Sequence, residues 1–186
     1  MSVGDKAVLF SVKPWWVSMI ATGKKTVEVR KTRPKLDTPF KVYIYQTLPR
    51  AGDFNERDGR VVGEFICDSV DRYARIGTTG ASRTYYMRID SEHIAHCIDY
   101  DPMCLTPNEF AEYGDGKELY GLHISNLELY KYPRPLFNFK LWNGCLNCKQ
   151  NGTYHCLQHC TGRFLERAPM SWCYVEEIDA AVYIGG

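Results

Sequence analysis

Hydrophobic and polar positions alternate in several short stretches of this 186-residue chain, and a period of two is typical of half-buried strands. Val, Ile, Tyr and Phe are frequent in these stretches, and turn-forming residues separate them. Pro133 and Pro135 are expected to break the pattern. Strands are therefore predicted at residues 7–12, 26–30, 40–45, 60–67, 119–125, 127–130, 171–175 and 180–184.

Two segments carry the start and stop signals of helices instead. Pro14 suits a first helical position and Gly23 suits the left-handed position after a last turn, which predicts a helix over residues 14–22. A second helix is indicated by a capping box and a terminal glycine, formed by Thr106, Pro107, Glu109 and Gly114. The predicted fold class is therefore α+β: a small mixed β-barrel with two or more inserted helices, in one domain over residues 1–186.

The composition is that of a globular protein, with 45% hydrophobic and 24% charged residues, and it excludes disordered and coiled-coil proteins. No run approaches the roughly 18 apolar residues of a membrane-spanning helix. Asp5 and Lys6 interrupt the apolar stretch that a signal peptide would need. A cytoplasmic protein without a membrane partner is expected.

The net charge of +1 hides an uneven distribution along the chain. Residues 1–60 contain 12 Lys or Arg and 6 Asp or Glu, whereas residues 61–130 contain 5 and 12. This basic excess favours a local site for an anion such as phosphate, the alternative being a solvated basic loop. Its members are Lys24, Lys25, Arg30, Lys31, Arg33, Lys35 and Lys41.

A compact charged set within this basic region carries the candidate binding chemistry. Arg30 offers a planar fork for phosphate or carboxylate, and Glu28 could accept a hydrogen bond from the exocyclic amine of a base. Lys13 and Lys25 add positive charge, and the neighbouring Glu28 carboxylate is expected to keep Lys25 in its charged form. If Lys25 is desolvated, it could instead act as a base or a nucleophile. The alternative is that Glu28 and Arg30 form an ion pair that only braces the strand.

Tryptophans offer flat surfaces on which a base could stack. Trp15 and Trp16 point about 100° apart on the predicted helix, so both can hardly be core residues. Trp172 is a further candidate. The alternative for each is packing of its element against the sheet.

Four of the eight cysteines lie within 16 residues, with the pairwise spacing of a tetrahedral zinc site. Zinc would organise a Cys-rich insertion at about residues 141–168 whose apolar content is low. All four ligand positions would be protein side chains, so the predicted zinc is structural; reduced thiols and disulfides are the alternatives. The predicted ligands are Cys145, Cys148, Cys156 and Cys160, with His155 and His159 as substitutes. The remaining histidines, His93, His96 and His123, are isolated in the sequence.

The stretch Ser11-Val-Lys-Pro-Trp-Trp, continued by Gly23-Lys-Lys-Thr-Val-Glu-Val-Arg-Lys, resembles the signature of the ASCH domain family, a Lys-Pro helix followed by a Gly-x-Lys-x-x-Glu-x-Arg strand. Residues 105–125 resemble the late helix and strand of that family, and residues 168–177 resemble the C-terminal segment of its phage and prophage members. The resemblance implies a PUA-like β-barrel, a cleft beside the first helix, and binding of RNA or a nucleotide.

One branch of the family is an amidohydrolase that removes acyl groups from N4-acetylcytidine with a Lys, a Thr and a Glu. Its Lys corresponds to Lys25, its Thr is replaced here by Glu28, and its Glu corresponds to Glu109 or Glu112.

Three functions therefore remain open. The first is a binding module for a nucleoside, nucleotide or RNA whose cleft is lined by Lys13, Trp15, Lys25, Glu28, Arg30 and Trp172. The second is an enzyme, an acylcytidine amidohydrolase or a ribonuclease, that uses Lys25, Glu28 and Glu109. The third is an interaction module organised by zinc.

Overall fold

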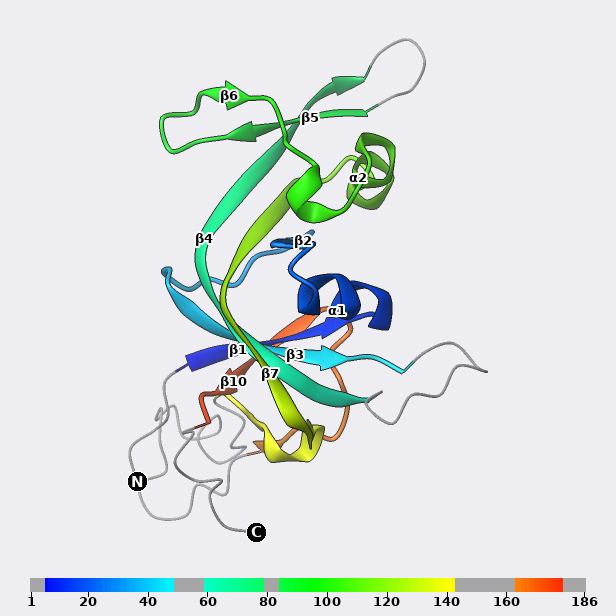
Figure 1. Ribbon diagram of the computed structural model, residues 1–186. Helices are drawn as coiled ribbons and strands as arrows, with labels where there is room; N and C mark the ends of the chain where they lie inside the picture. The colour runs from blue at the N-terminus through cyan, green and yellow to red at the C-terminus, as the bar shows by residue number, and fades with distance from the viewer. Residues whose placement is uncertain (1–5, 49–58, 79–83, 143–162, 179–186) are drawn as a thin grey trace, which may run out of the picture. The chain divides into compact units, whose positions relative to one another are not determined.

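Strands dominate the computed structural model, which describes residues 6–48, 59–78, 84–142 and 163–178 (Figure 1). The contacts within the chain group it into two units that interleave along the sequence. Unit 1 consists of residues 1–17, 41–65 and 128–186, and unit 2 consists of residues 18–40 and 66–127.

Unit 1 is built on a sheet in which the strands follow the order β4-β3-β1-β10-β8-β9. The central strand β1 pairs in parallel with β3 and antiparallel with β10. A short 3-10 helix, η2 (Leu136–Asn138), precedes β8. The strands are β1 (Lys6–Val12), β3 (Phe40–Gln46), β8 (Lys140–Leu141), β9 (Arg163–Phe164), β10 (Trp172–Glu176) and the first part of β4 (Arg60–Thr78).

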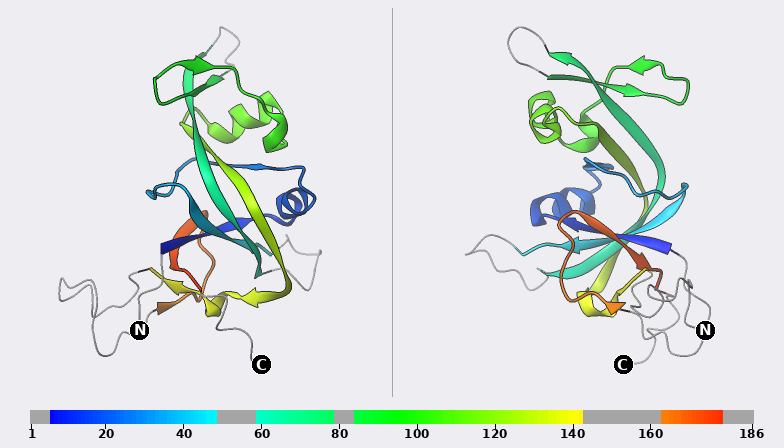
Figure 2. Two further views of the ribbon diagram at one scale, coloured as in Figure 1. Left: turned by 60° about the vertical axis from the view of Figure 1, so that its left-hand side comes forward. Right: turned by 180° about the vertical axis from the view of Figure 1, so that it is seen from behind.

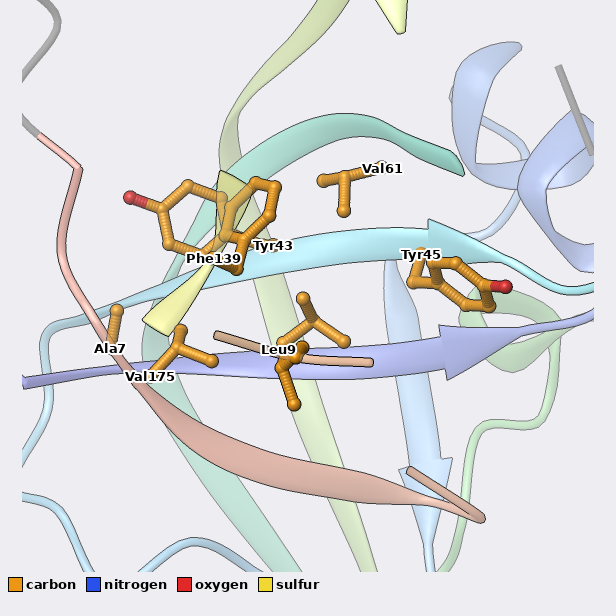
Figure 3. Packing of buried hydrophobic residues seen from close by; sticks show 8 residues of the cluster. Ala7, Leu9, Tyr43, Tyr45, Val61, Phe139 and Val175 are labelled. Atoms are coloured by element: carbon orange, nitrogen blue, oxygen red, sulfur yellow. The ribbon is translucent and has the colours of Figure 1, made fainter. Parts of the chain in front are cut away.

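A hydrophobic cluster of unit 1 packs against this sheet, and in it the Tyr43 and Phe139 rings meet edge to face with centroids 4.9 Å apart (Figure 3). The main chain of Ile178 donates a hydrogen bond of 2.9 Å to the Tyr43 hydroxyl, which satisfies the polar end of that buried ring. The other buried members of the cluster are Ala7, Leu9, Tyr45, Val61, Leu165 and Val175.

Unit 2 contains a sheet in the order β2-β7-β4-β5-β6, with one helix packed on its core. Phe110 is the centre of that core, because the rings of Tyr73, Tyr86 and Tyr100 each meet it edge to face at 5.2–5.4 Å. The elements are β2 (Val27–Arg30), β5 (Thr84–Ile89), β6 (Ala95–His96), the 3-10 helix η1 (Asp101–Met103), the helix α2 (Pro107–Gly114) and the first part of β7 (Leu119–Pro135).

Both predicted helices are confirmed. The helix α1 (Pro14–Ala21) contributes residues to both units, and Gly23 after it has the expected left-handed backbone with φ of 71°. The helix α2 starts with the predicted capping box between Thr106 and Glu109. These start and stop signals are local in sequence, so they do not depend on contacts with distant residues.

The strand predictions needed three corrections. The strand expected at 60–67 continues as β4 to Thr78, and the two expected at 119–125 and 127–130 form the single strand β7, with Asn126 at a φ of 47° between them. Pro133 lies inside β7 instead of breaking it, whereas β7 does end at Pro135. Proline is tolerated in a strand where its missing N–H is not needed by a neighbour. Figure 2 shows β4 and β7 running side by side, as the strand order requires.

The prediction of a closed barrel is also corrected, because the hydrogen-bonded path through the described strands starts at β2 and ends at β9 without closing. The mixed, sheet-dominated α+β class is confirmed. Most of the predicted Cys-rich insertion, and the strand expected at 180–184, lie outside the described residues.

Within the described ranges, no helix combines the length and the apolar character needed to cross a bilayer.

Candidate ligand-binding site

The strand β2 positions the predicted charged residues. It pairs antiparallel with β7, so that Glu28 lies opposite Leu122 and Arg30 opposite Tyr120. Its two valines pack in the core of unit 2. Because side chains alternate along a strand, Glu28 and Arg30 project from the opposite face of β2, as the sequence pattern predicted.

Lys25, Glu28 and Arg30 come together as a buried cluster, here named the charged triad. Their exposed fractions are only 3%, 6% and 7%. Arg30 Nη2 lies 2.9 Å from Glu28 Oε1, and Lys25 Nζ lies 3.5 Å from Glu28 Oε2. The ion pair that was considered as a strand brace is therefore present, but it is buried and shared with a second cation.

The two Glu28 oxygens differ in how well they are satisfied. Oε1 has the close Arg30 contact, whereas Oε2 is buried without a hydrogen bond to any described residue. The 3.5 Å to Lys25 Nζ is long for an N–H···O hydrogen bond. Each carboxylate oxygen can accept more than one hydrogen bond, so Oε2 has capacity for a further donor.

Burial changes the acid–base character of Lys25. Desolvation lowers the pKa of the Lys25 ammonium below its ordinary value, and the Glu28 carboxylate opposes that shift without cancelling it. Desolvation therefore outweighs the effect of Glu28 on the pKa of Lys25, as the alternative of a desolvated lysine required. The ammonium also donates a hydrogen bond of 2.8 Å to the carbonyl oxygen of Met103.

The segment around η1 holds the Lys25 end of the triad in place. The Thr26 main chain donates to the carbonyl oxygen of Pro102 at 2.8 Å, and the Cys104 thiol donates to that of Lys24 at 3.3 Å. Cys104 has a left-handed backbone with φ of 54°, which is uncommon for a residue other than glycine. Nothing in the sequence pattern indicated this contact, because the partners lie about 80 residues apart.

Tyr113 of α2 is a neighbour of the triad that the sequence analysis did not select. Burial of its hydroxyl raises the pKa of Tyr113, while Arg30 lowers it and Glu28 raises it, so both charges lie close to the phenol. Helical spacing could have indicated Tyr113, because it lies three residues after the core residue Phe110 and therefore on a neighbouring part of the helix surface.

Glu109 is exposed and its hydrogen bonds belong to the capping box. Its Oε2 accepts from the Thr106 main chain at 2.8 Å and from the Thr106 hydroxyl at 2.7 Å. These bonds lower the pKa of the Glu109 carboxyl, which makes it a weaker base. Glu112 is exposed on the same helix. A catalytic role for either remains a prediction.

The remaining predicted ligand-binding residues belong to unit 1. Lys13 is exposed, and Trp15 is 63% exposed, as expected if only one of the paired tryptophans packs in the core. Trp172 is half-buried, with its ring edge to face with Tyr174 at 5.2 Å. Their assembly with the charged triad in one cleft remains a prediction.

A cavity of about 350 Å³ is present in unit 1 and is not the predicted cleft. It is lined by Leu141, Phe164, Leu165, Glu166 and Arg167. The predicted zinc ligands Cys145, Cys148, Cys156 and Cys160 lie outside the described residues. Inside them, no group of three or more His, Cys, Asp or Glu side chains is arranged to hold a metal ion.

His123, which is isolated in the sequence, is paired in unit 2. Its Nε2 lies 2.9 Å from Asp71 Oδ2, and the Tyr73 hydroxyl donates to the same oxygen at 3.3 Å. The hydrogen bond with Asp71 raises the pKa of His123. Burial alone would raise the pKa of Asp71, but His123 and Arg88 lower it below its ordinary value. This cluster ties β4 to β7 by a charge-assisted contact.

No protein-family model matches the sequence, and no curated protein is significantly similar to it. Similar solved structures include crystal structures of ASCH from Zymomonas mobilis and of two point mutants of that protein. The unmutated protein has 18% sequence identity and a TM-score of 0.48, over 70% of this chain and 73% of its own. The mutants have 18% identity and TM-scores of 0.48 and 0.47, over 73% and 71% of this chain and 78% and 77% of theirs.

Proposed function

We propose that this chain is a nucleotide- or RNA-binding module of the ASCH type, in which the charged triad recognises a base and its phosphate. The observation that carries the proposal is the buried Glu28 Oε2, which accepts no hydrogen bond from the described residues. A buried polar atom without a partner is rare in proteins, and it suggests a donor that comes from a ligand.

The energetics of burial support a role other than stability. Taking three charged groups out of water is costly, and well-packed apolar residues of similar volume often stabilise a fold as well or better. Strongly perturbed ionisable groups are enriched at functional sites. The triad therefore fits a binding site better than a structural brace.

Hydrogen-bond chemistry favours a base with an exocyclic amine. The Glu28 carboxylate only accepts hydrogen bonds, as the amino group of cytosine requires, whereas uracil presents a carbonyl oxygen at that position. Arg30 and Lys25 only donate, so they suit a carbonyl or phosphate oxygen of the same nucleotide. Lys24 and Lys31 directly precede and follow the triad residues in the sequence, and both are exposed, so they add to the positive potential of the site.

Isothermal titration calorimetry with cytidine and uridine monophosphates and a short cytidine-rich RNA tests the proposal. We expect the cytidine ligands to bind, and Arg30→Ala to weaken binding by about 1–3 kcal/mol, the range for a charge-assisted contact. Lys117→Ala removes an exposed cation of the same unit and should change little. Equal losses of affinity in both variants would mean that the basic residues attract the ligand without a defined site, and the assignment of the site to the triad would be wrong.

Glu28→Gln adds a second arm to the experiment. Glutamine both accepts and donates, so this variant should lose much of the preference for cytidine over uridine. An unchanged preference would mean that Glu28 does not contact the base.

A second candidate function, hydrolysis of N4-acylated cytidine, is favoured by the lowered pKa of Lys25. A neutral amine could take a proton from the water that attacks the acyl carbon, and Arg30 could stabilise the oxyanion that forms. The Lys25 ammonium would then return that proton to the leaving N4 nitrogen, so that the carbon–nitrogen bond breaks and a carboxylate and cytidine are formed.

N4-acetylcytidine should be assayed with the wild type, Lys25→Ala, Glu28→Gln and Glu109→Gln. Turnover lost in Lys25→Ala and kept in Glu109→Gln is the expected pattern. If the wild type shows no turnover, the amidohydrolase function loses its main substrate. RNA cleavage measured in parallel tests the ribonuclease alternative.

A further inference from the structure

A lysine and a tyrosine meet beside the charged triad. The Lys31 ammonium lies 5.3 Å from the centre of the Tyr113 ring. Tyr113 is 39% exposed and Lys31 is exposed, so both are within reach of a ligand from solvent.

The position of this pair is fixed by its neighbours in unit 2. Lys31 directly follows Arg30, the last residue of β2. On the other side, Phe110 anchors α2 in the core, and the last turn packs so closely that a Cβ added at Gly114 would lie 2.2 Å from the Tyr86 hydroxyl oxygen. Tyr113, one residue earlier, is therefore held on a rigid turn next to Glu28 and Arg30.

We propose that Tyr113 and Lys31 extend the charged triad into a site for a nucleoside phosphate, with the base stacked on Tyr113 and the phosphate bound by Lys31. This inference rests on the proposed function of the triad. It adds two binding residues, Tyr113 for the base and Lys31 for the phosphate.

The ring of Tyr113 suits stacking because it is partly exposed near the end of α2, and a tyrosine has only two side-chain torsions to fix when a ligand binds. The Lys31 ammonium that lies over the ring belongs to a flexible, exposed side chain. Cation–π contacts at exposed sites are weak, so a base can displace the ammonium from the ring.

The displaced ammonium then has a natural partner in the phosphate of the same nucleotide. A lysine binds phosphate as a point charge and needs no fixed geometry, so it can follow the ligand. A free nucleotide and a nucleotide within RNA share this chemistry of a flat base joined to a phosphate. The experiment has to distinguish these two sources.

Calorimetric titration of the full chain with cytidine, cytidine 5′-monophosphate and a short oligocytidylate tests the inference. We expect the monophosphate to bind about tenfold more tightly than cytidine, a ratio typical of one charge-assisted contact, and Lys31→Ala to reduce that ratio. Tyr113→Leu should weaken all three ligands about tenfold or more by removing the stacking surface, whereas Tyr113→Phe keeps the ring and should lose little. Tighter binding of the oligocytidylate than of the monophosphate would identify RNA as the source.

The chain offers a matched control in Lys131 and Tyr132, where an ammonium also lies 5.3 Å from an exposed ring. Lys131→Ala should leave all affinities unchanged. Equal binding of cytidine and its monophosphate by the wild type, or an effect of Lys131→Ala equal to that of Lys31→Ala, would overturn the inference.

Failure of the inference can be told from failure of the proposed function. If the wild type binds and Arg30→Ala abolishes binding while Lys31→Ala and Tyr113→Leu do not matter, only the inference is wrong. If no cytidine ligand binds, or Arg30→Ala has no effect, the proposed function falls and the inference falls with it.

Discussion

Glu28 is the only anion of the charged triad, and its replacement by glutamine should destabilise the fold more than removal of either cation. Glu28→Gln keeps the size of the side chain but removes its charge. Lys25 and Arg30, each less than a tenth exposed, would then lie buried next to each other with no countercharge from the triad. Leaving a buried charge uncompensated typically costs about 3–5 kcal/mol.

Lys25→Met is the matched comparison, because methionine has a similar length and no charge. It leaves the 2.9 Å contact of Glu28 with Arg30 in place and removes an ammonium whose burial is unfavourable. Its cost comes mainly from the Met103 carbonyl oxygen, which loses the hydrogen bond from Lys25. An unsatisfied buried acceptor costs about 1–3 kcal/mol, and relief of desolvation offsets part of it.

Urea and thermal denaturation followed by circular dichroism measure both variants. The free energy of unfolding should fall by about 3–5 kcal/mol for Glu28→Gln and by about 1 kcal/mol for Lys25→Met. For a chain of this size, 1 kcal/mol corresponds to about 2–4 °C in Tm, so the two variants should be clearly separated. Equal losses would refute the reasoning, since charge balance within the triad would then be irrelevant.

Three further predictions concern other parts of the chain. Thr106→Ala removes the cap of α2 and should lower the free energy of unfolding by about 1 kcal/mol in urea denaturation. His123→Gln should destabilise the protein at about pH 5 and much less at about pH 9, because a histidine whose pKa is raised on folding stabilises fully below its ordinary pKa and loses that contribution as the pH rises through the folded value. The pKa of Asp71 is lowered on folding, so its contribution to the free energy of unfolding persists until the pH falls below about 4. If His123→Gln destabilises the protein equally at both pH values, the ion pair is contradicted. Metal analysis should find about one zinc per chain that Cys148→Ser removes, and an absence of zinc in the wild type would end that prediction.

The elements that the sequence predicted well are those with local signals. The capping box of α2 joins Thr106 and Glu109, three positions apart, and the strand pattern of residues 40–45 is continuous. The extension of β4 over residues 68–78 was missed because that part carries polar residues such as Asp71 at half-buried positions. Its partners in β5 and β7 make it a strand, and they lie far along the chain.

The candidate site was predictable only in part for the same reason. The spacing of Glu28 and Arg30 along one strand, with Lys25 just before it, was enough to predict a compact charged set. Their burial was not predictable, because Met103 and the η1 segment that hold Lys25 lie 78 residues away in sequence. His123 and Asp71 lie 52 residues apart, so no local sequence pattern indicates that they pair.

The two proposed functions require opposite protonation states of Lys25, and this separates them without reference to any one substrate. Binding of a phosphate is favoured by the ammonium, so affinity should fall as the pH rises through the lowered pKa of Lys25. Hydrolysis with Lys25 as base requires the neutral amine, so the rate at saturating substrate should rise over the same range. A nearby phosphate would also raise the pKa of the ammonium, which means that a strongly bound nucleotide phosphate would suppress the hydrolytic form. A site built for phosphorylated nucleotides would therefore be a poor amidohydrolase on them, and any hydrolysis should be fastest on uncharged acylated nucleosides.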